Sequence, residues 1–452
     1  MLIHPAQPSG TDDRAPFPGD ATPAVVAPMP GEGHPVVVVG AGPVGLAAAA
    51  HLAERGLEFL VLEAGTSVAP TIEQWGQVRL FSPWQHDIDV AARRLLDAAG
   101  WSPPDMRDLP TGAQLIDGYL APLAKLPTLA IRIRFGMHVT GMTRLGFDRV
   151  RSAGREVAPF LVRVAGEPDI LARAVIDASG TWRTPNVLGA YGLAAHGEVE
   201  AAGLGRIVPA LPDVLGSDRA RFAGRRTVVV GTGHSAATTL LALAELATET
   251  SGTQPVWAMR GLAAGRVFGD SDVDPLPARS ALGRRLQTKV ESGAVELVAG
   301  FHTHAVEVAG DQVVLLGRQV DGKEQRIAAN LVVNATGFRP DHSLGSELRL
   351  DLDPILGSAR ALAPLIDPNH HSCNTVPPHG VAELTHSEPG YYAVGVKSYG
   401  RAPTFLLATG YEQVRSVVAA LAGDWHAARR VELSLPGSGA SSTIDAGNGA
   451  CC

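Results

Sequence analysis

Two glycine-rich segments of the chain have the residue types and spacing that bind the phosphates of a dinucleotide. They read VVVVGAGPVGLAAA and TVVVGTGHSAATTLLAL, and in each an apolar strand pattern runs through a turn into a helix pattern. Glycine permits a tight turn and close approach of the backbone to a pyrophosphate, while the helix N-terminus supplies N–H donors. One such turn is a weak signal, but two predict two bound dinucleotides. The turn residues are Gly40, Gly42, Gly45, Gly231, Gly233 and Ala236, which replaces a third glycine in the second turn.

A different charged residue ends the next apolar run in each unit. Glu63 ends LEFLVLEA, and a carboxylate there accepts hydrogen bonds from ribose hydroxyls and repels a 2′-phosphate, which predicts FAD or NAD. Arg260 ends PVWAMR, and a guanidinium forms charged, bidentate contacts with a 2′-phosphate, which predicts NADPH. The alternatives are a solvated acid for Glu63 and a simple surface charge for Arg260.

Each unit closes with a further strand that ends in a glycine turn. The first, AVIDASG, ends at Gly180, and the second, LVVNATG, ends at Gly337. Two complete units with different ribose-side residues indicate that electrons pass between two different dinucleotides.

The elements that position these turns predict an α/β fold with two Rossmann-like dinucleotide-binding domains, for FAD and NADPH, each with a small antiparallel β insert. The alternative is two unrelated βαβ units. Residues 186–222 lack periodicity and are expected to be a connector. The predicted division is a disordered leader (1–33), the first part of the FAD domain (34–222), the NADPH domain (223–330), the return of the FAD domain (331–425) and a flexible C-terminal tail (426–452).

Composition narrows the functions that need to be considered. The net charge is −7 with no long basic stretch, so no nucleic-acid partner is expected. Apolar runs are too short to span a membrane, and the N-terminal residues do not resemble a signal peptide. Only three cysteines are present, which argues against a disulfide scaffold and favours the cytoplasm. A homodimer is left open.

Six segments make the chain resemble the flavoproteins with two dinucleotide-binding domains, and within them the flavin-dependent monooxygenases. The resemblance spans about residues 36–423. The segments are GAGPVG with Glu63, GTGHSA with Arg260, DASGTWRTPN (Asp177–Asn186), NATGFRPD (Asn334–Asp341), GYYAVG (Gly390–Gly395) and TGYEQVRS (Thr409–Ser416).

Together with the glycine turns, this resemblance implies two sets of cofactor-binding residues. For FAD they are Gly40, Gly42, Pro43, Gly45, Glu63, Ala64, Trp75, Arg79, Ser179, Gly180, Gly395 and Thr409. For NADPH they are Gly231, Gly233, His234, Ser235, Ala236, Arg260, Thr336 and Gly337.

The activity implied is that of an NADPH-dependent monooxygenase. NADPH reduces FAD, molecular oxygen reacts with the reduced flavin, and one oxygen atom passes to a small substrate at a soft N, S or metalloid centre or at a carbonyl. Two departures matter. The chain has neither the C-x-x-C nor the C-x-x-x-x-C redox pair of the disulfide reductases in this superfamily, and the F-x-G-x-x-x-H segment usual in the flavin monooxygenases is missing before the second glycine turn. The segment SYGRAPTFLLATGYEQVRSVVAAL (398–421) and the chain end also resemble flavoproteins of actinobacterial arsenic-resistance clusters. This resemblance implies a metalloid or organoarsenical substrate.

Two other functions stay open. One is an NADPH-dependent reductase of a thiol, quinone or metal ion that uses Cys451 and Cys452 as an electron shuttle, since mercuric reductases also end near adjacent cysteines. The other is a flavin-binding redox sensor or interaction protein with slow turnover.

The catalytic residue itself is not identified by the sequence. Trp84 and Arg79 follow the first ribose-side strand and are candidates to line the flavin pocket. Lys397 and Arg401 are candidates to bind an anionic substrate or a flavin phosphate. Cys373 is a candidate substrate-contacting thiol in a Pro-rich loop with three histidines, where no metal site is expected. Each of these residues is instead explained by packing or solvation in the simpler alternative. The candidates are Arg79, Trp84, Cys373, Lys397 and Arg401.

Overall fold

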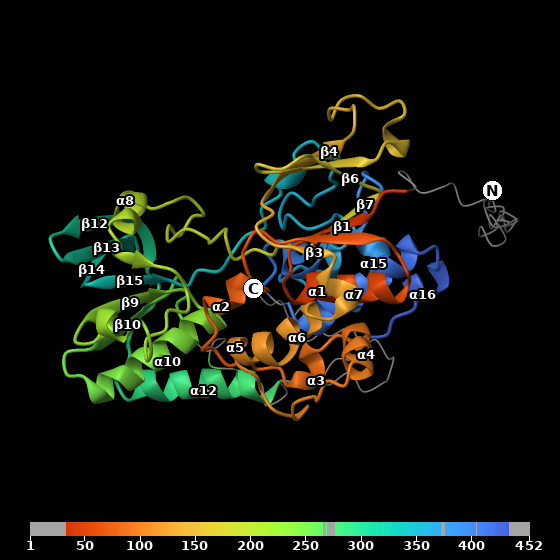
Figure 1. The fold of residues 1–452 in the computed structure, drawn as a ribbon. Coiled ribbons are helices and arrows are strands. Elements are labelled where there is room, and N and C mark those ends of the chain that lie inside the picture. The colour runs from red at the N-terminus through yellow and green to blue at the C-terminus, as the bar shows by residue number, and fades with distance from the viewer. Residues whose placement is uncertain are drawn as a thin grey trace, which may run out of the picture.

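The computed structural model describes residues 33–264, 268, 276–319, 321–371, 376–403 and 405–433. Two parallel sheets lie in two α/β units placed side by side, and each unit carries a small antiparallel sheet (Figure 1). The predicted fold class is therefore confirmed. Apart from Gly33, the predicted leader lies outside the described residues, as does the part of the predicted tail after residue 433.

The first sheet has the strand order β16-β7-β1-β2-β3, with parallel pairing throughout. Alternate valines of β1 pack against helices α1 (Pro43–Glu54) and α15 (Leu407–Leu421) on one face and against the antiparallel insert on the other. A strand covered on both faces is apolar at every position, which explains the run of four valines. The strands are β1 (Val36–Val39), β2 (Phe59–Leu62), β3 (Ile133–Arg134), β7 (Ala174–Asp177) and β16 (Tyr391–Ala393).

The second sheet repeats this arrangement with the order β11-β10-β9-β15-β8. Its strand β9 is likewise covered by helix α10 (His234–Glu249) on one face and by the second insert on the other. The central strand and its two neighbours thus correspond in the two sheets, as the repeated sequence pattern predicts. The strands are β8 (Ile207–Val208), β9 (Arg226–Val230), β10 (Gln254–Ala258), β11 (Glu296–Val298) and β15 (Leu331–Asn334).

Each antiparallel insert has three strands and lies on the sheet face opposite the main helices. The first is formed by β4 (Val139–Arg144), β5 (Phe160–Val164) and β6 (Ile170–Ala172), and the second by β12 (His302–Ala309), β13 (Gln312–Arg318) and β14 (Glu324–Ala329).

Helices cover the remaining faces, and α1 and α15 pack side by side below the first sheet in Figure 1. None of the helices in the described ranges has the length and apolar character needed to cross a membrane. Those of the first unit are α1 (Pro43–Glu54), α2 (Pro70–Glu73), α3 (Trp84–Asp87), α4 (Val90–Ala98), α5 (Gly112–Leu115), the π-helix η1 (Ile116–Leu120), α6 (Ala121–Ala124), α7 (Pro127–Ala130), the 3₁₀ helices η2 (Arg155–Val157), η3 (Ser343–Gly345) and η4 (Gly395–Tyr399), α13 (Ala363–Ile366), α14 (Val381–Leu384), α15 (Leu407–Leu421) and α16 (Trp425–Arg429). The second unit and its approach contain α8 (Glu198–Gly203), α9 (Arg219–Phe222), α10 (His234–Glu249) and α12 (Pro277–Glu291).

The structure shifts three of the predicted boundaries. Strands β8 and β15 both pair within the second sheet, although boundaries at residues 223 and 330 left them in the first unit. Because β8 has only two residues, no periodicity marks it in the expected connector. Helix α16 occupies the start of the expected tail, where Asp424 caps it by accepting a 3.0 Å hydrogen bond from the backbone N–H of Ala427.

Candidate functional site

The first glycine turn joins β1 to α1. Gly40 has φ +100°, and a Cβ on it would lie 2.8 Å from the carbonyl oxygen of Ala178, just after β7. A Cβ on Gly45 would lie 2.0 Å from the carbonyl oxygen of Gly40, so packing requires glycine at both positions. Gly42 instead faces open space, and no side chain caps the N-terminus of α1. The first N–H groups of this helix are therefore available to a phosphate.

Glu63, directly after β2, is held against this turn. Its Oε2 accepts a 2.7 Å hydrogen bond from the backbone N–H of Ala41, and its Oε1 accepts one of 2.8 Å from Gly65. The residue is only 7% exposed, so it is not the solvated acid of the alternative interpretation. Each carboxylate oxygen has a second lone pair, which leaves the group able to accept hydrogen bonds from ribose hydroxyls.

Behind the first closing turn lies a buried ion pair between Lys397 and Asp177. The Lys397 Nζ is 2.7 Å from Asp177 Oδ2 and 3.0 Å from Ser179 Oγ, and the two charged side chains are 1% and 0% exposed. Burial alone would raise the pKa of Asp177, but the Lys397 ammonium and hydrogen bonds from Ser179 together lower that pKa below its usual value. Tyr391 Oη donates a further hydrogen bond of 3.0 Å to Oδ2. Lys397 therefore already has an anionic partner and fixes the turn at Ser179 and Gly180.

A second buried network attaches the segment around Gly395 to α15. The backbone N–H of Gly395 donates to Gln413 Oε1 at 2.8 Å, and Gln413 Nε2 donates to Ser398 Oγ at 2.8 Å and lies 3.0 Å from His379 Nε2. Burial lowers the pKa of His379, which favours a neutral ring at pH 7. Thr409, predicted to face the flavin, is buried in the first turn of α15.

The second glycine turn repeats the geometry of the first. Gly231 has φ +139°, and a Cβ there would lie 2.1 Å from the carbonyl oxygen of Ala335, just after β15. Gly233 faces open space, and α10 has no side-chain cap at its N-terminus. Both turns therefore offer the same open helix end to a phosphate.

The ribose side of the second unit carries no acid. Strand pairing aligns Val39 with Leu62 and Val230 with Ala258, so Met259 rather than Arg260 corresponds to Glu63. Met259 is buried, and Arg260 is the first exposed side chain after β10. The guanidinium of Arg260 donates to the carbonyl oxygen of Ala190 at 2.9 Å and lines a cavity of about 410 Å³.

Aromatic contacts join the two units beside the turns. The ring of Phe81 lies 4.8 Å, centroid to centroid, from the ring of His234 in the first turn of α10. Trp182 stacks on Phe338 at 4.7 Å and approaches Trp75 at 6.4 Å. His234 and Trp75, both predicted to be near a cofactor, therefore lie where the first and second units meet.

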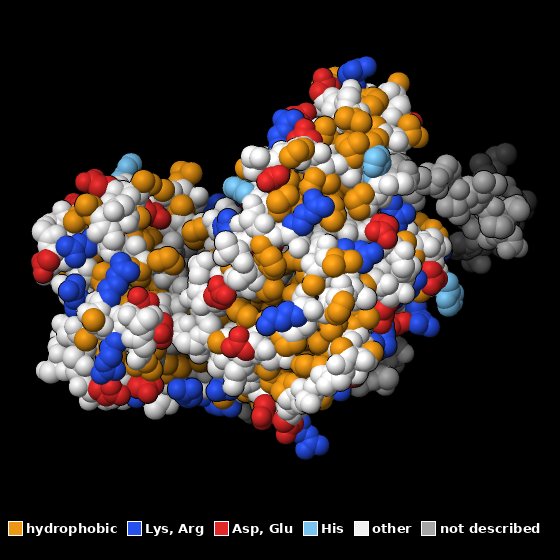
Figure 2. Space-filling view, viewed as in Figure 1, with side chains coloured by type: hydrophobic (Ala, Val, Ile, Leu, Met, Phe, Trp, Pro, Cys, Tyr) orange, Lys and Arg blue, Asp and Glu red, His pale blue; other side chains and the backbone are white. Residues whose placement is uncertain are grey.

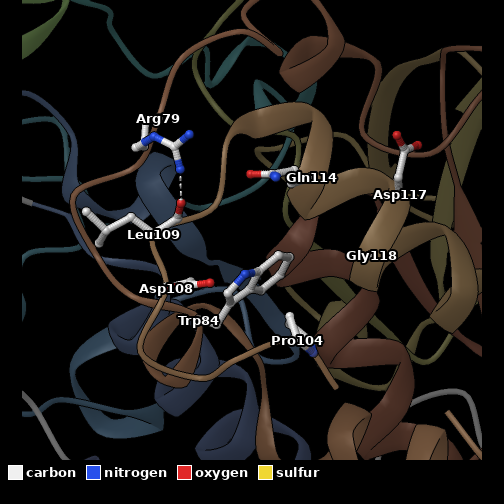
Figure 3. Close-up of a pocket in the computed structure, with 8 residues that line it drawn as sticks. All are labelled: Arg79, Trp84, Pro104, Asp108, Leu109, Gln114, Asp117 and Gly118. Atoms are coloured by element: carbon white, nitrogen blue, oxygen red, sulfur yellow. Dashed lines mark hydrogen bonds between the residues drawn. The ribbon is translucent and has the colours of Figure 1, made fainter. Parts of the chain in front are cut away.

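A second cavity, of about 490 Å³, brings together the candidates Arg79 and Trp84 (Figure 3). Asp108, Gln114 and Asp117 contribute polar groups to its lining, and Arg79 donates a hydrogen bond to the carbonyl oxygen of Leu109. The volume suits a small ligand. Its lining comes from residues 79–118 and includes no residue of either glycine turn.

The other candidates divide between described and undescribed parts of the chain. Arg401 lines the 410 Å³ cavity together with Arg260 and Arg339, which the sequence analysis did not single out. Cys373 lies outside the described residues. Gln413 and Asp177 were also missed as site residues, although a charged residue ending a buried apolar strand, as in AVIDASG, is a usable signal for Asp177.

These residues fit the two cofactors that the sequence predicts. Each turn has an uncapped helix N-terminus above a glycine with open space at its Cβ position, and the first unit holds a carboxylate with free acceptor capacity beside it. Fold and site together define a two-domain oxidoreductase that uses FAD and a nicotinamide dinucleotide.

Comparison with known proteins identifies the family. The chain belongs to the pyridine nucleotide-disulphide oxidoreductase family, whose model matches residues 37–375. A search of curated proteins found no match.

Several solved structures share this fold. Bacillithiol disulfide reductase from Bacillus cereus superposes with a TM-score of 0.63 and 18% identity, over 86% of this chain and 99% of that one. The FAD-bound cadaverine monooxygenase of Erwinia amylovora superposes with a TM-score of 0.60 and 15% identity, over 91% of this chain and 99% of that one. Ornithine N-hydroxylase from Kutzneria sp. 744 was solved with reduced FAD, NADP⁺ and L-ornithine. It superposes with a TM-score of 0.56 and 17% identity, over 86% of this chain and 99% of that one. At these identities the likeness shows the fold, which both reductases and monooxygenases use.

Proposed function

We propose that the protein is an NADPH-dependent flavin monooxygenase acting on a small molecule with a soft N, S or metalloid centre, or on a carbonyl. NADPH, a proton, molecular oxygen and substrate would give NADP⁺, water and the oxygenated product. When bound, FAD would supply hydride acceptance and oxygen activation.

The observation that carries this proposal is the set of groups around the first closing turn. Asp177, Ser179 and Lys397 supply oxygen and nitrogen atoms there. The sequence also has neither the C-x-x-C nor the C-x-x-x-x-C motif whose thiols would receive electrons from the flavin of a disulfide reductase.

The protein's own residues would bind and orient the two dinucleotides. Glu63 would accept hydrogen bonds from the FAD ribose, and Arg260 would hold the 2′-phosphate of NADPH. The buried Lys397–Asp177 pair would keep the closing turn rigid, so that the turn is ordered before the cofactor binds.

The second candidate is an NADPH-dependent reductase in which Cys451 and Cys452 carry electrons onward. It is favoured by the adjacent thiols and by the disulfide reductase among the solved structures that share the fold.

One experiment separates the two. Full-length protein and a truncation after Ser442 are mixed with NADPH in air, and oxygen uptake, hydrogen peroxide and oxygenated product are measured across candidate substrates. For a monooxygenase, substrate-stimulated NADPH oxidation is largely unchanged by truncation. Loss of more than about nine-tenths of turnover, with flavin reduction intact and activity restored by an added dithiol, would establish the reductase instead.

A further inference from the structure

The 410 Å³ cavity lies on the boundary between the two units and is lined by three arginines. Arg260 follows β10 of the second unit, Arg339 follows the second closing turn, and Arg401 follows η4 in the first unit. No acidic side chain contributes to its lining. Segments far apart in the sequence therefore bring three cations to one small cavity.

The three guanidinium groups have no carboxylate partner among the described residues. Arg260 donates to the carbonyl oxygen of Ala190, and Arg339 Nε donates to Asn186 Oδ1 at 2.6 Å. These are neutral acceptors that orient a guanidinium without balancing its charge. Burial and the nearby charge of Arg401 both lower the pKa of Arg339. Mutual repulsion between cations that have no counter-ion in the described part of the chain is relieved when a ligand brings an anion.

The fixed orientation of the Arg339 side chain also favours binding of an oxyanion. Asn186 is fixed from several sides: its Nδ2 donates to the carbonyl of Thr336 at 2.9 Å, and its backbone N–H donates to that of Gly337 at 2.9 Å. The Asn186–Arg339 hydrogen bond therefore holds Arg339 against the closing turn of the second unit. A planar guanidinium held by one of its donors still presents others to a phosphate or carboxylate.

We propose that Arg260, Arg339 and Arg401 form one oxyanion site that takes the 2′-phosphate of NADPH, so that residues from both units select the cofactor. The inference deepens the proposed function and rests on its use of NADPH. The acid group of a substrate has the same chemistry, but Arg260 favours the 2′-phosphate because it lies one residue beyond the position of Glu63, on the ribose side of the second turn.

A consequence is that NADPH would bridge the two units. Arg401 and Arg260 belong to different units, so a single phosphate contacting both would add a link beside the Phe81–His234 contact. NADH, which lacks this phosphate, would not add that link.

The test measures dissociation constants of NADP⁺ and NAD⁺ for the purified, FAD-loaded full-length protein by calorimetry. Arg401→Gln is the cleanest variant, because no described group forms a hydrogen bond with its guanidinium. Arg285→Gln, an exposed arginine on α12, removes the same charge elsewhere and serves as the control. We expect Arg401→Gln to weaken NADP⁺ binding by about tenfold or more and to leave NAD⁺ within about twofold, as for loss of a charged hydrogen bond. Arg401→Lys should recover part of the loss.

Three results would overturn the proposal. Arg401→Gln binds NADP⁺ as tightly as Arg285→Gln does, or it loses NADP⁺ and NAD⁺ equally, or it keeps NADP⁺ binding while losing affinity for inorganic pyrophosphate and for acidic substrates. The last result would assign the arginines to the substrate. Binding is measured without turnover, so failure to find an oxygenated product would refute the proposed function and leave this measurement untouched.

Discussion

Replacing Lys397 with methionine tests whether the buried pair with Asp177 holds the first closing turn. Methionine fills much of the same volume and removes only the ammonium, so Asp177, 0% exposed, would keep a charge with no cationic partner. Removing one partner of a buried ion pair costs about 3–5 kcal/mol. Hydrogen bonds from Ser179 and Tyr391 to Asp177 persist, which favours the lower half of that range.

The pH dependence distinguishes this effect from a simple packing defect. In the wild type the pKa of Asp177 is lowered, so its contribution to stability is present above the unfolded-state pKa of about 4 and is lost as pH falls below it. Without Lys397, burial is opposed only by the remaining hydrogen bonds from Ser179 and Tyr391, and it raises that pKa. The unfolded state then loses the proton first as pH rises, so the variant's loss of stability relative to the wild type should be larger at pH 8 than at pH 5.

The assay follows melting by flavin release and by tryptophan fluorescence at both pH values, because a two-unit chain need not unfold in one step. Asp177→Asn combined with Lys397→Met removes both charges and should recover much of the loss. Lys323→Met is the control, since it breaks an exposed 2.9 Å pair with Asp321 and should change little. The reasoning is refuted if Lys397→Met melts like the control, or if its loss of stability relative to the wild type shrinks from pH 5 to pH 8.

Three further changes test separate parts of the structure. Burial raises the pKa of Asp87 to about 7 against a hydrogen bond from Ser82, so the native carboxyl stays protonated while the unfolded one ionises. The contribution of Asp87 to the free energy of unfolding falls by up to about 4 kcal/mol as pH rises from about 4 to 7. The melting temperature of Asp87→Asn should therefore fall less between pH 5 and pH 8 than that of the wild type, and an equal fall in both proteins would contradict this. Glu63→Arg should lower the flavin content of purified protein, measured by absorbance, by placing a cation at the ribose; a fully loaded variant would count against that role. Arg260→Ala should raise the KM for NADPH about tenfold and leave that for NADH nearly unchanged; equal rises would show that Arg260 does not contact the 2′-phosphate.

The sequence predicts the parts of this molecule that depend on local pattern. The two glycine turns, the strands before them, Glu63 and the antiparallel inserts all follow from short spacings, and the structure has the corresponding elements where they were expected. Packing explains why the two turns can be recognised from the sequence. A Cβ on Gly40 or Gly231 would clash with a carbonyl oxygen just after the closing strand, so those positions admit only glycine.

Features that depend on contacts between distant segments were missed. Lys397 and Asp177 are 220 positions apart, and no periodicity links them. Arg339 meets Arg401 only because the second closing turn faces the loop after η4. Strand β8 is two residues long and exists because β15 offers it a free edge. In each case the tertiary fold, rather than local propensity, decides the outcome.

The charged residue on the ribose side lies one position later in the second dinucleotide site than in the first. In the first unit the position after the second strand is Glu63, held by two backbone N–H groups, whereas in the second it is buried Met259, and the cation comes one residue later. Met259 can neither bind ribose hydroxyls nor repel a 2′-phosphate. Removing the Arg260 cation would therefore weaken binding of the phosphate without creating an acceptor for the NAD ribose. Loss of Arg260 should thus cost NADPH affinity and bring no gain with NADH, because the two cofactor preferences depend on different residues.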